Sequence, residues 1–146
     1  MFQLHQSFGY ILNQAARTMA NALAASLKPY DLTPYHFGTL VVLAEEEGIN
    51  QKELARRTYD DEPTTKRVVD KLMAKKLVVR KPHPTDRRAY RLYLTDGARE
   101  VLPSIIAEAE KTNGEIARRF TPEEFRELTG LLKRIGPETS EPGESR

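Results

Sequence analysis

The sequence predicts a mainly helical fold with one β-hairpin, in which long helices flank a smaller lobe. Apolar residues recur at steps of three and four over the first 27 residues and again beyond residue 97, as in amphipathic helices. Two short segments, residues 77–81 and 90–94, are β-branched or strictly alternating, which is typical of strands. The 146 residues suit one compact domain, and no apolar run approaches the roughly 18 residues that span a bilayer.

The first predicted helix occupies most of residues 1–30. It ends at Lys28-Pro29, because proline disfavours helical conformation in the residue before it. A terminal helix with so long an apolar stripe needs a partner to cover it. The stripe consists of Phe8, Ile11, Leu12, Ala15, Met19, Leu23 and Leu27.

The next two helices are marked by their N-caps. Thr33 and Pro34 suit the N-cap and the first position of a second helix. The acids at its end, residues 45–47, oppose the helix dipole, so we expect them to be solvated. Asn50, with Glu53 three residues later, is a capping-box variant that begins a short third helix.

A fourth helix is predicted to begin near Asp61, with Pro63 in its first turn. Its inner face is apolar. Its other side chains are polar or basic, and they are Thr64, Thr65, Lys66, Arg67 and Lys71.

The two predicted strands are joined by residues 82–89, which contain two prolines and an aspartate and indicate an exposed loop with a basic tip. Thr95 or Asp96 then caps a long helix. A capping box at Thr121–Glu124 begins the last one. A short helix, a turn, a basic helix and a basic hairpin, in this order, are the layout of a winged helix-turn-helix.

The charge distribution points to a polyanion as the partner. Residues 63–94 hold ten basic and two acidic side chains, a formal charge of +8. The rest of the chain holds thirteen basic and nineteen acidic side chains, a charge of −6. A local excess of this size is hard to attribute to solubility alone.

Over residues 50–97 the sequence resembles the MarR family of bacterial and archaeal transcriptional regulators, and the flanking helices extend the resemblance to roughly residues 5–135. The sequence departs from the family pattern at Tyr59 and Asp60, where a glycine and an apolar residue are usual. It departs again at Lys76, where a glycine commonly ends the helix. The resemblance is carried by the segments Gln51–Arg57, Pro63–Leu72, Leu77–Arg80, Asp86–Arg88 and Leu92–Gly97.

The resemblance implies a homodimer in which the terminal helices intertwine and two winged lobes bind a pseudo-palindromic operator in double-stranded DNA. It divides the chain into an N-terminal dimerisation helix (1–30), a winged helix-turn-helix lobe (31–97), C-terminal dimerisation helices (98–136) and a tail expected to be disordered (137–146). Within the lobe, the helix-turn-helix covers about residues 50–73 and the wing about residues 77–95.

The helix-turn-helix side chains have predicted roles in reading DNA. Thr64 and Thr65 can bond bases or contact thymine methyl groups, and Arg67 can form a bidentate pair with guanine. Lys66 and Lys71 suit phosphates, which position the protein without specifying sequence. The alternative is that this is only a solvated helix face.

The wing is predicted to add minor-groove and backbone contacts. Arg87 and Arg88 suit a narrow minor groove, and Asp86 is expected to orient one of them by an ion pair. Arg91 would contact a phosphate or occupy the solvent face of its strand. The alternative is an ordinary exposed turn.

In relatives, a cleft between the dimer helices and the lobe binds small aromatic acids. The resemblance therefore implies a repressor that a small aromatic or phenolic ligand releases. For each residue proposed to bind the ligand, the alternative role is packing in the core or the dimer interface. These candidates are Phe8, Arg17, Tyr30, Tyr35, His36 and Phe37.

Other functional classes find little support in the sequence. The absence of cysteine excludes disulfides and thiolate sites. His5, His36 and His83 lie far apart, so we expect no metal site, and we expect no cofactor. No catalytic motif indicates an enzyme. The alternative to a DNA-binding regulator is a winged-helix module that binds protein or RNA. By default we expect the protein in the cytoplasm.

Overall fold

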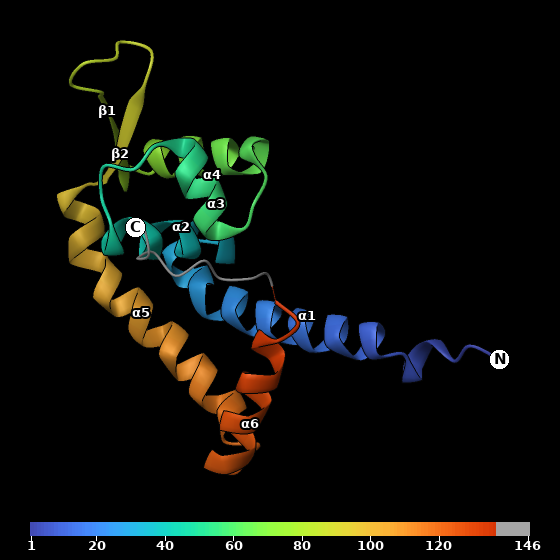
Figure 1. Ribbon diagram of the computed structural model, residues 1–146. Helices are drawn as coiled ribbons and strands as arrows, with labels where there is room; N and C mark the ends of the chain where they lie inside the picture. The colour runs from blue at the N-terminus through green and yellow to red at the C-terminus, as the bar shows by residue number, and fades with distance from the viewer. Residues whose placement is uncertain (137–146) are drawn as a thin grey trace. The chain divides into compact units, whose positions relative to one another are not determined.

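The computed structural model describes residues 1–136, and the chain forms two compact units, Met1–Thr112 and the residues from Asn113 onward (Figure 1). The boundary falls within a helix, and the functional division proposed above stays a prediction. The predicted disorder of residues 137–146 concerns positions outside the described residues. In chain order the elements are η1 (Leu4–Gln6), α1 (Phe8–Leu27), η2 (Lys28–Tyr30), α2 (Pro34–Glu45), α3 (Gln51–Thr58), α4 (Glu62–Ala74), β1 (Val78–Pro82), β2 (Tyr90–Leu94), α5 (Asp96–Ala117) and α6 (Pro122–Lys133).

The predicted mainly helical fold with a two-stranded hairpin is confirmed. In the first unit, α2, α3 and α4 surround a core in which Leu40, Leu43, Leu54 and Leu72 are almost completely buried. Strands β1 and β2 pair antiparallel, with Val78 opposite Leu94. The hairpin projects beyond α3 and α4 as a wing (Figure 1).

The wing is anchored to the core at its base. Leu92 of β2 is buried, and its main chain forms an isolated bridge with Ile49, in the segment that leads into α3. The amide of Gly48, whose φ is 79°, donates to the carbonyl of Leu92 over 2.8 Å. The start of the helix-turn-helix is therefore bonded directly to the wing.

Three helices end in a left-handed residue that is not glycine. These residues are Asp31, Tyr59 and Lys76, with φ of 53°, 57° and 58°. At Lys76 the amide donates to the Met73 carbonyl, and the next amide, of Leu77, donates to the Leu72 carbonyl. This is the bonding pattern of a Schellman motif, which glycine normally occupies because other residues are disfavoured there. The chain keeps the left-handed ends of α3 and α4 without that glycine.

The terminal helices leave apolar side chains uncovered. Phe8 and Ile11 of α1 are 63% and 53% exposed. In the second unit, Leu131, Leu132 and Ile135 are at least 38% exposed. Ser7 is extended and separates η1 from α1. No helix among residues 1–136 is both long enough and apolar enough to cross a membrane.

Candidate nucleic-acid interface

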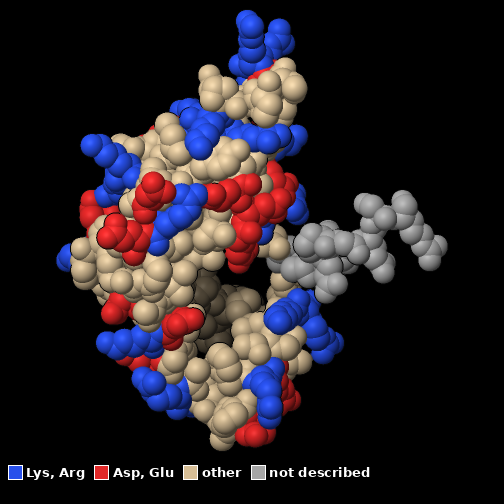
Figure 2. All heavy atoms as spheres, turned by 90° about the vertical axis from the view of Figure 1, so that its left-hand side faces the viewer, with Lys and Arg blue, Asp and Glu red and all other residues tan. Residues whose placement is uncertain are grey.

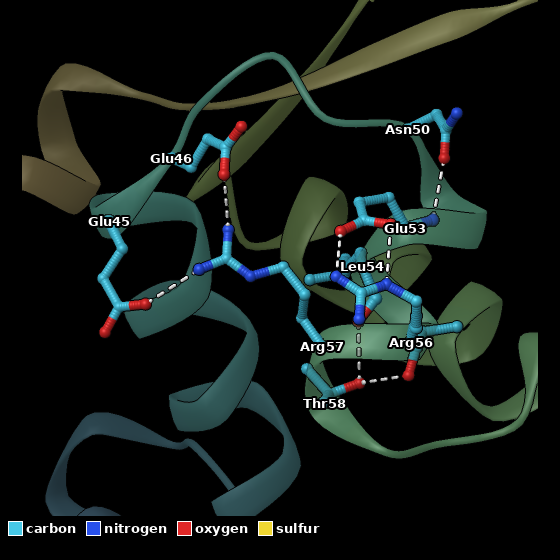
Figure 3. A network of polar contacts seen from close by, with 9 residues as sticks. Glu45, Glu46, Asn50, Glu53, Leu54, Arg56, Arg57 and Thr58 are labelled. Atoms are coloured by element: carbon cyan, nitrogen blue, oxygen red, sulfur yellow. Dashed lines mark hydrogen bonds and ion pairs between the residues drawn. The ribbon is translucent and has the colours of Figure 1, made fainter. Parts of the chain in front are cut away.

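Side-chain caps and ion pairs hold the helix-turn-helix in place. Asn50 Oδ1 accepts from the amide of Glu53 over 2.8 Å at the start of α3, as its spacing predicts. Arg57, at the end of α3, donates to Glu45 over 3.0 Å and to Glu46 over 2.9 Å, which fixes α3 to the end of α2 (Figure 3).

The acids at residues 45–47 are exposed, as expected, but they also form specific contacts. Besides the pairs of Glu45 and Glu46 with Arg57, Glu47 accepts from Arg99 of α5 over 2.6 Å and from the amide of Leu94 over 2.8 Å. Burial raises the pKa of Glu47, but the hydrogen bonds from Arg99 and Leu94 outweigh it and leave the pKa below its usual value. Each acid is placed by a specific partner.

Helix α4 presents one polar face and buries the other. Asp61 is its N-cap, and its Oδ1 accepts from the amide of Thr64 over 2.6 Å. Arg67 is exposed and donates to the hydroxyl of Thr64 over 3.1 Å, so these two side chains lie together on the outer surface. Lys66 and Lys71 are also exposed.

Thr65 does not belong to this face. Its side chain is only 2% exposed, and its hydroxyl donates to the carbonyl of Asp61 over 3.0 Å. The expectation that Thr65 reads bases is corrected, because the helical period places position 65 on the buried side together with Val68, Val69 and Leu72.

One carboxylate connects α4 to the wing. Asp70 accepts from Lys66 over 2.7 Å on its own helix and from Arg80 of β1 over 3.2 Å. The hydrogen bond from Lys66 is the main reason that the pKa of Asp70 lies below its usual value, and Arg80 contributes. The guanidinium of Arg80 also lies 5.8 Å from the ring centre of Tyr90 on β2.

The arginines at the wing tip are exposed, as predicted. The carboxylate of Asp86 accepts from the main-chain amide of Arg88 over 2.9 Å, so the contact found for it is with the backbone and not the expected ion pair. Arg91 is half-buried, and its Nη2 lies 3.1 Å from Nε2 of His83. Figure 2 shows Lys and Arg gathered at the tip of the wing, with a band of acidic residues lower on the molecule.

A groove of about 350 Å³ runs between the start of α3, helix α4 and the wing. We call it the basic groove, because Lys52, Lys66, Arg80 and Arg88 line it, together with Tyr90. Sequence reasoning counted Arg80 in the basic segment but did not single out Lys52, Arg80 or Tyr90. Only the pairing of β1 with β2 and the packing of α3 bring these three residues to the same place.

The predicted ligand-binding residues do not converge on one cavity. His36 is 6% exposed, and its Nδ1 accepts from the amide of Thr33 to complete a capping box. It lines a cleft of about 570 Å³ with Lys28, Lys71 and Lys75, and burial lowers its pKa, helped by Lys75 and then Lys71.

The remaining ligand candidates lie elsewhere. Tyr35 and Phe37 line a separate hollow of about 500 Å³, which is largely apolar. Arg17 lines a third hollow near the start of α1, on which Phe8 is exposed. Tyr30 packs against the core. Within one chain the six residues therefore line different places, and their role in a ligand cleft between the dimer helices and the lobe stays a prediction.

Comparisons with known proteins find transcriptional regulators. Residues 30–89 match the pattern of the MarR family. A proposed transcriptional regulator of the hcr operon in Thauera aromatica is 34% identical over 110 residues, which cover 75% of this chain and 66% of that protein. The match thus spans just under two thirds of that relative's length.

Solved structures extend the likeness to almost the whole chain. A probable transcriptional regulator from Pseudomonas aeruginosa is 31% identical, with a TM-score of 0.87 over 92% of this chain and 100% of that one. The transcriptional repressor CouR, solved on a 23-mer DNA duplex, is 28% identical, with a TM-score of 0.84 over 90% of this chain and 94% of that one.

Proposed function

Because the chain belongs to the MarR family of DNA-binding transcriptional regulators, which are not enzymes, we propose that it is a homodimeric repressor that binds a pseudo-palindromic operator in the cytoplasm. In this proposal α4 enters the major groove and the wing enters the adjacent minor groove. The alternative, a winged helix that binds protein or RNA, makes no such demand on duplex DNA.

The basic groove is the observation that carries the proposal. In a duplex, one phosphate strand separates a major groove from the neighbouring minor groove. A protein that reads both grooves must therefore receive that strand between its two reading elements. The basic groove lies between α4 and the wing, and Lys52, Lys66, Arg80 and Arg88 line it. Phosphate contacts of this kind position a protein on DNA.

The proposed roles within the interface follow from exposure. Arg67 reads a guanine, and Thr64 supports it through their 3.1 Å hydrogen bond. Lys71 holds a phosphate, and Arg87 and Arg88 enter an A·T-rich minor groove. The exposed apolar side chains of α1 and α6 support a dimer, whose two α4 helices would meet major grooves about 10 base pairs apart.

The test is a titration of operator and random duplexes at several salt concentrations. If six to ten phosphates are neutralised, affinity falls by roughly 10³–10⁵ between about 50 and 200 mM salt. Arg67→Ala weakens operator binding by about 1–3 kcal/mol and relaxes the preference at one base position per half-site. Lys71→Ala weakens all sequences alike and reduces the salt slope. Arg126→Ala, an equal charge change on α6, is the matched control and leaves binding unchanged.

The result that contradicts the proposal is equally specific. If Arg67→Ala, Lys71→Ala and the double variant of Arg87 and Arg88 all matched the wild type on operator DNA, α4 and the wing would not be the reading surface. Binding to protein or structured RNA would then become the better explanation of the basic segment.

We further propose that a small aromatic or phenolic ligand releases the repressor from DNA. The apolar hollow lined by Tyr35 and Phe37 supports this, because it also reaches Thr58 at the end of α3 and Asp60 in the turn that leads into α4. A ligand placed there would contact the segment that leads into α4 and sets its orientation.

Gly38 offers a clean test of ligand release. It lines the hollow, and a Cβ added at this position meets no atom within 4 Å. Gly38→Leu should fill the hollow and abolish release by benzoate, salicylate or phenol, while Gly38→Ala should remain responsive. If one of these probes released the wild type and Gly38→Leu from the operator equally, the ligand would bind elsewhere.

A further inference from the structure

His83 lies at the base of the wing loop, residues 83–89, and its ring contacts polar groups of Thr85 and Asp86 within that loop. Its Nδ1 lies 3.1 Å from the amide nitrogen of Asp86 and 3.2 Å from that of Thr85. The hydroxyl of Thr85 lies 3.3 Å from the same atom. Its Nε2 lies 3.1 Å from Nη2 of Arg91 on β2.

These contacts select one form of the imidazole. Both main-chain amides are donors, so Nδ1 must keep its lone pair to accept them. The single proton of the neutral ring is then on Nε2 and faces the guanidinium of Arg91, which is also a donor. That contact is therefore not a hydrogen bond. The two facing donors separate when the Arg91 guanidinium turns to an acceptor, such as a phosphate oxygen.

The wing loop depends on the ring for its shape. The amide of His83 donates to the carbonyl of Ala89 over 3.0 Å, and the amide of Ala89 donates to the carbonyl of Asp86 over 3.2 Å. With the two bonds to Nδ1, these contacts close the loop that carries Arg87 and Arg88. Residues 85 and 86, immediately before the arginines, are held by the imidazole alone through their amides.

We propose that His83 is the positioning residue of the wing, holding the loop in its DNA-reading shape through the unprotonated Nδ1. The proposal rests on the proposed function, since it assumes that the wing reads a minor groove. The guanidinium of Arg91 lies against the ring from β2, and the main-chain amide of Asp86 lies against it from the loop.

The consequence is a separation of specificity from affinity. Replacing a histidine that only contacted phosphates would weaken binding to every duplex. Replacing a positioning histidine instead removes discrimination between A·T-rich and G·C-rich operator flanks, and it does not weaken binding to random duplex.

The experiment measures flank discrimination, the ratio of Kd values for operators with G·C-rich and A·T-rich flanks. His83→Ala should lower this ratio about five- to tenfold relative to the wild type, the effect of losing one or two hydrogen bonds. His83→Asn, whose carbonyl can accept the same amides, should keep the ratio of the wild type.

The outcomes that overturn the proposal are distinct from failure of the proposed function. If the wild type bound no duplex, the DNA-binding function itself would fall before any variant was compared, and this inference with it. If it bound but His83→Ala kept full discrimination, only the role of His83 would be wrong. Long-range proton–nitrogen correlation spectra provide a readout without DNA, and an Nδ1–H tautomer of His83 would refute the proposal directly.

Discussion

Replacing Lys76 by glycine should stabilise the protein, although it removes a side chain. Lys76 has φ of 58°, a left-handed conformation just after the end of α4. The structural contacts of this residue are made by its main chain. Its amide donates to Met73, and its carbonyl accepts from the hydroxyl of Thr95 over 2.7 Å. Both bonds are available to glycine.

The expected change in the free energy of unfolding is the difference between two opposing contributions. A residue with a Cβ pays roughly 1–2 kcal/mol for the left-handed conformation. Glycine avoids this cost but loses about 0.5–1 kcal/mol more conformational entropy on folding than a residue with a side chain. Lys76→Gly should therefore raise the free energy of unfolding by about 0.5–1 kcal/mol, and the melting temperature by about 2 °C.

The assay is urea unfolding followed by circular dichroism, at equal protein concentrations so that any dimerisation affects all samples alike. Ala74→Gly is the matched control, since Ala74 is an exposed residue in the last turn of the same helix. It should lower stability by about 0.5–1 kcal/mol. If Lys76→Gly destabilised the protein as much as Ala74→Gly does, the left-handed end of α4 would be refuted.

Three further predictions concern dimerisation, pH and the anchoring of α3. Leu132→Glu should give a monomer in sedimentation, because a dimer interface would bury an unpaired carboxylate, and an intact DNA-binding dimer would contradict this. The pKa of Glu47 lies below its usual 4.5, so its contribution to stability should be complete above that pH and be lost below it. Glu47→Gln should flatten that part of the unfolding profile, and an unchanged acid profile would refute the assignment. Arg57→Ala should lower the free energy of unfolding in urea by about 0.5–1 kcal/mol. Arg56→Ala, which removes an exposed ion pair within α3, should lower it less. Equal losses of stability would refute the anchoring role of Arg57.

The local signals in the sequence were enough to predict the helix starts. Thr33, Asn50, Asp61 and Thr121 each cap a helix as expected, because an N-cap depends on a side chain and an amide three residues apart. The ends of α3 and α4 carry no such signal, because Tyr59 and Lys76 adopt the left-handed conformation although neither is glycine.

The candidate interface was predictable only where it depends on a single element. The helical period and the basic composition are sufficient to place Arg67 and Lys71 on the outer face of α4. The same period should have excluded Thr65, which lies four residues before the buried Val69 and three before Val68. By contrast, the basic groove joins Lys52 to Arg80 across 28 positions in the sequence, and no local pattern reports such a contact.

The bridge made by Asp70 has a mechanical consequence. Because this carboxylate bonds both Lys66 of α4 and Arg80 of β1, the two reading elements are held at one separation and one relative angle. In a duplex, the offset between a major groove and the next minor groove is set by the helical twist. A lobe of fixed geometry therefore measures that twist. Operator occupancy should respond to torsional stress, so that an intercalator or a change in superhelical density releases the protein without touching a base that it contacts.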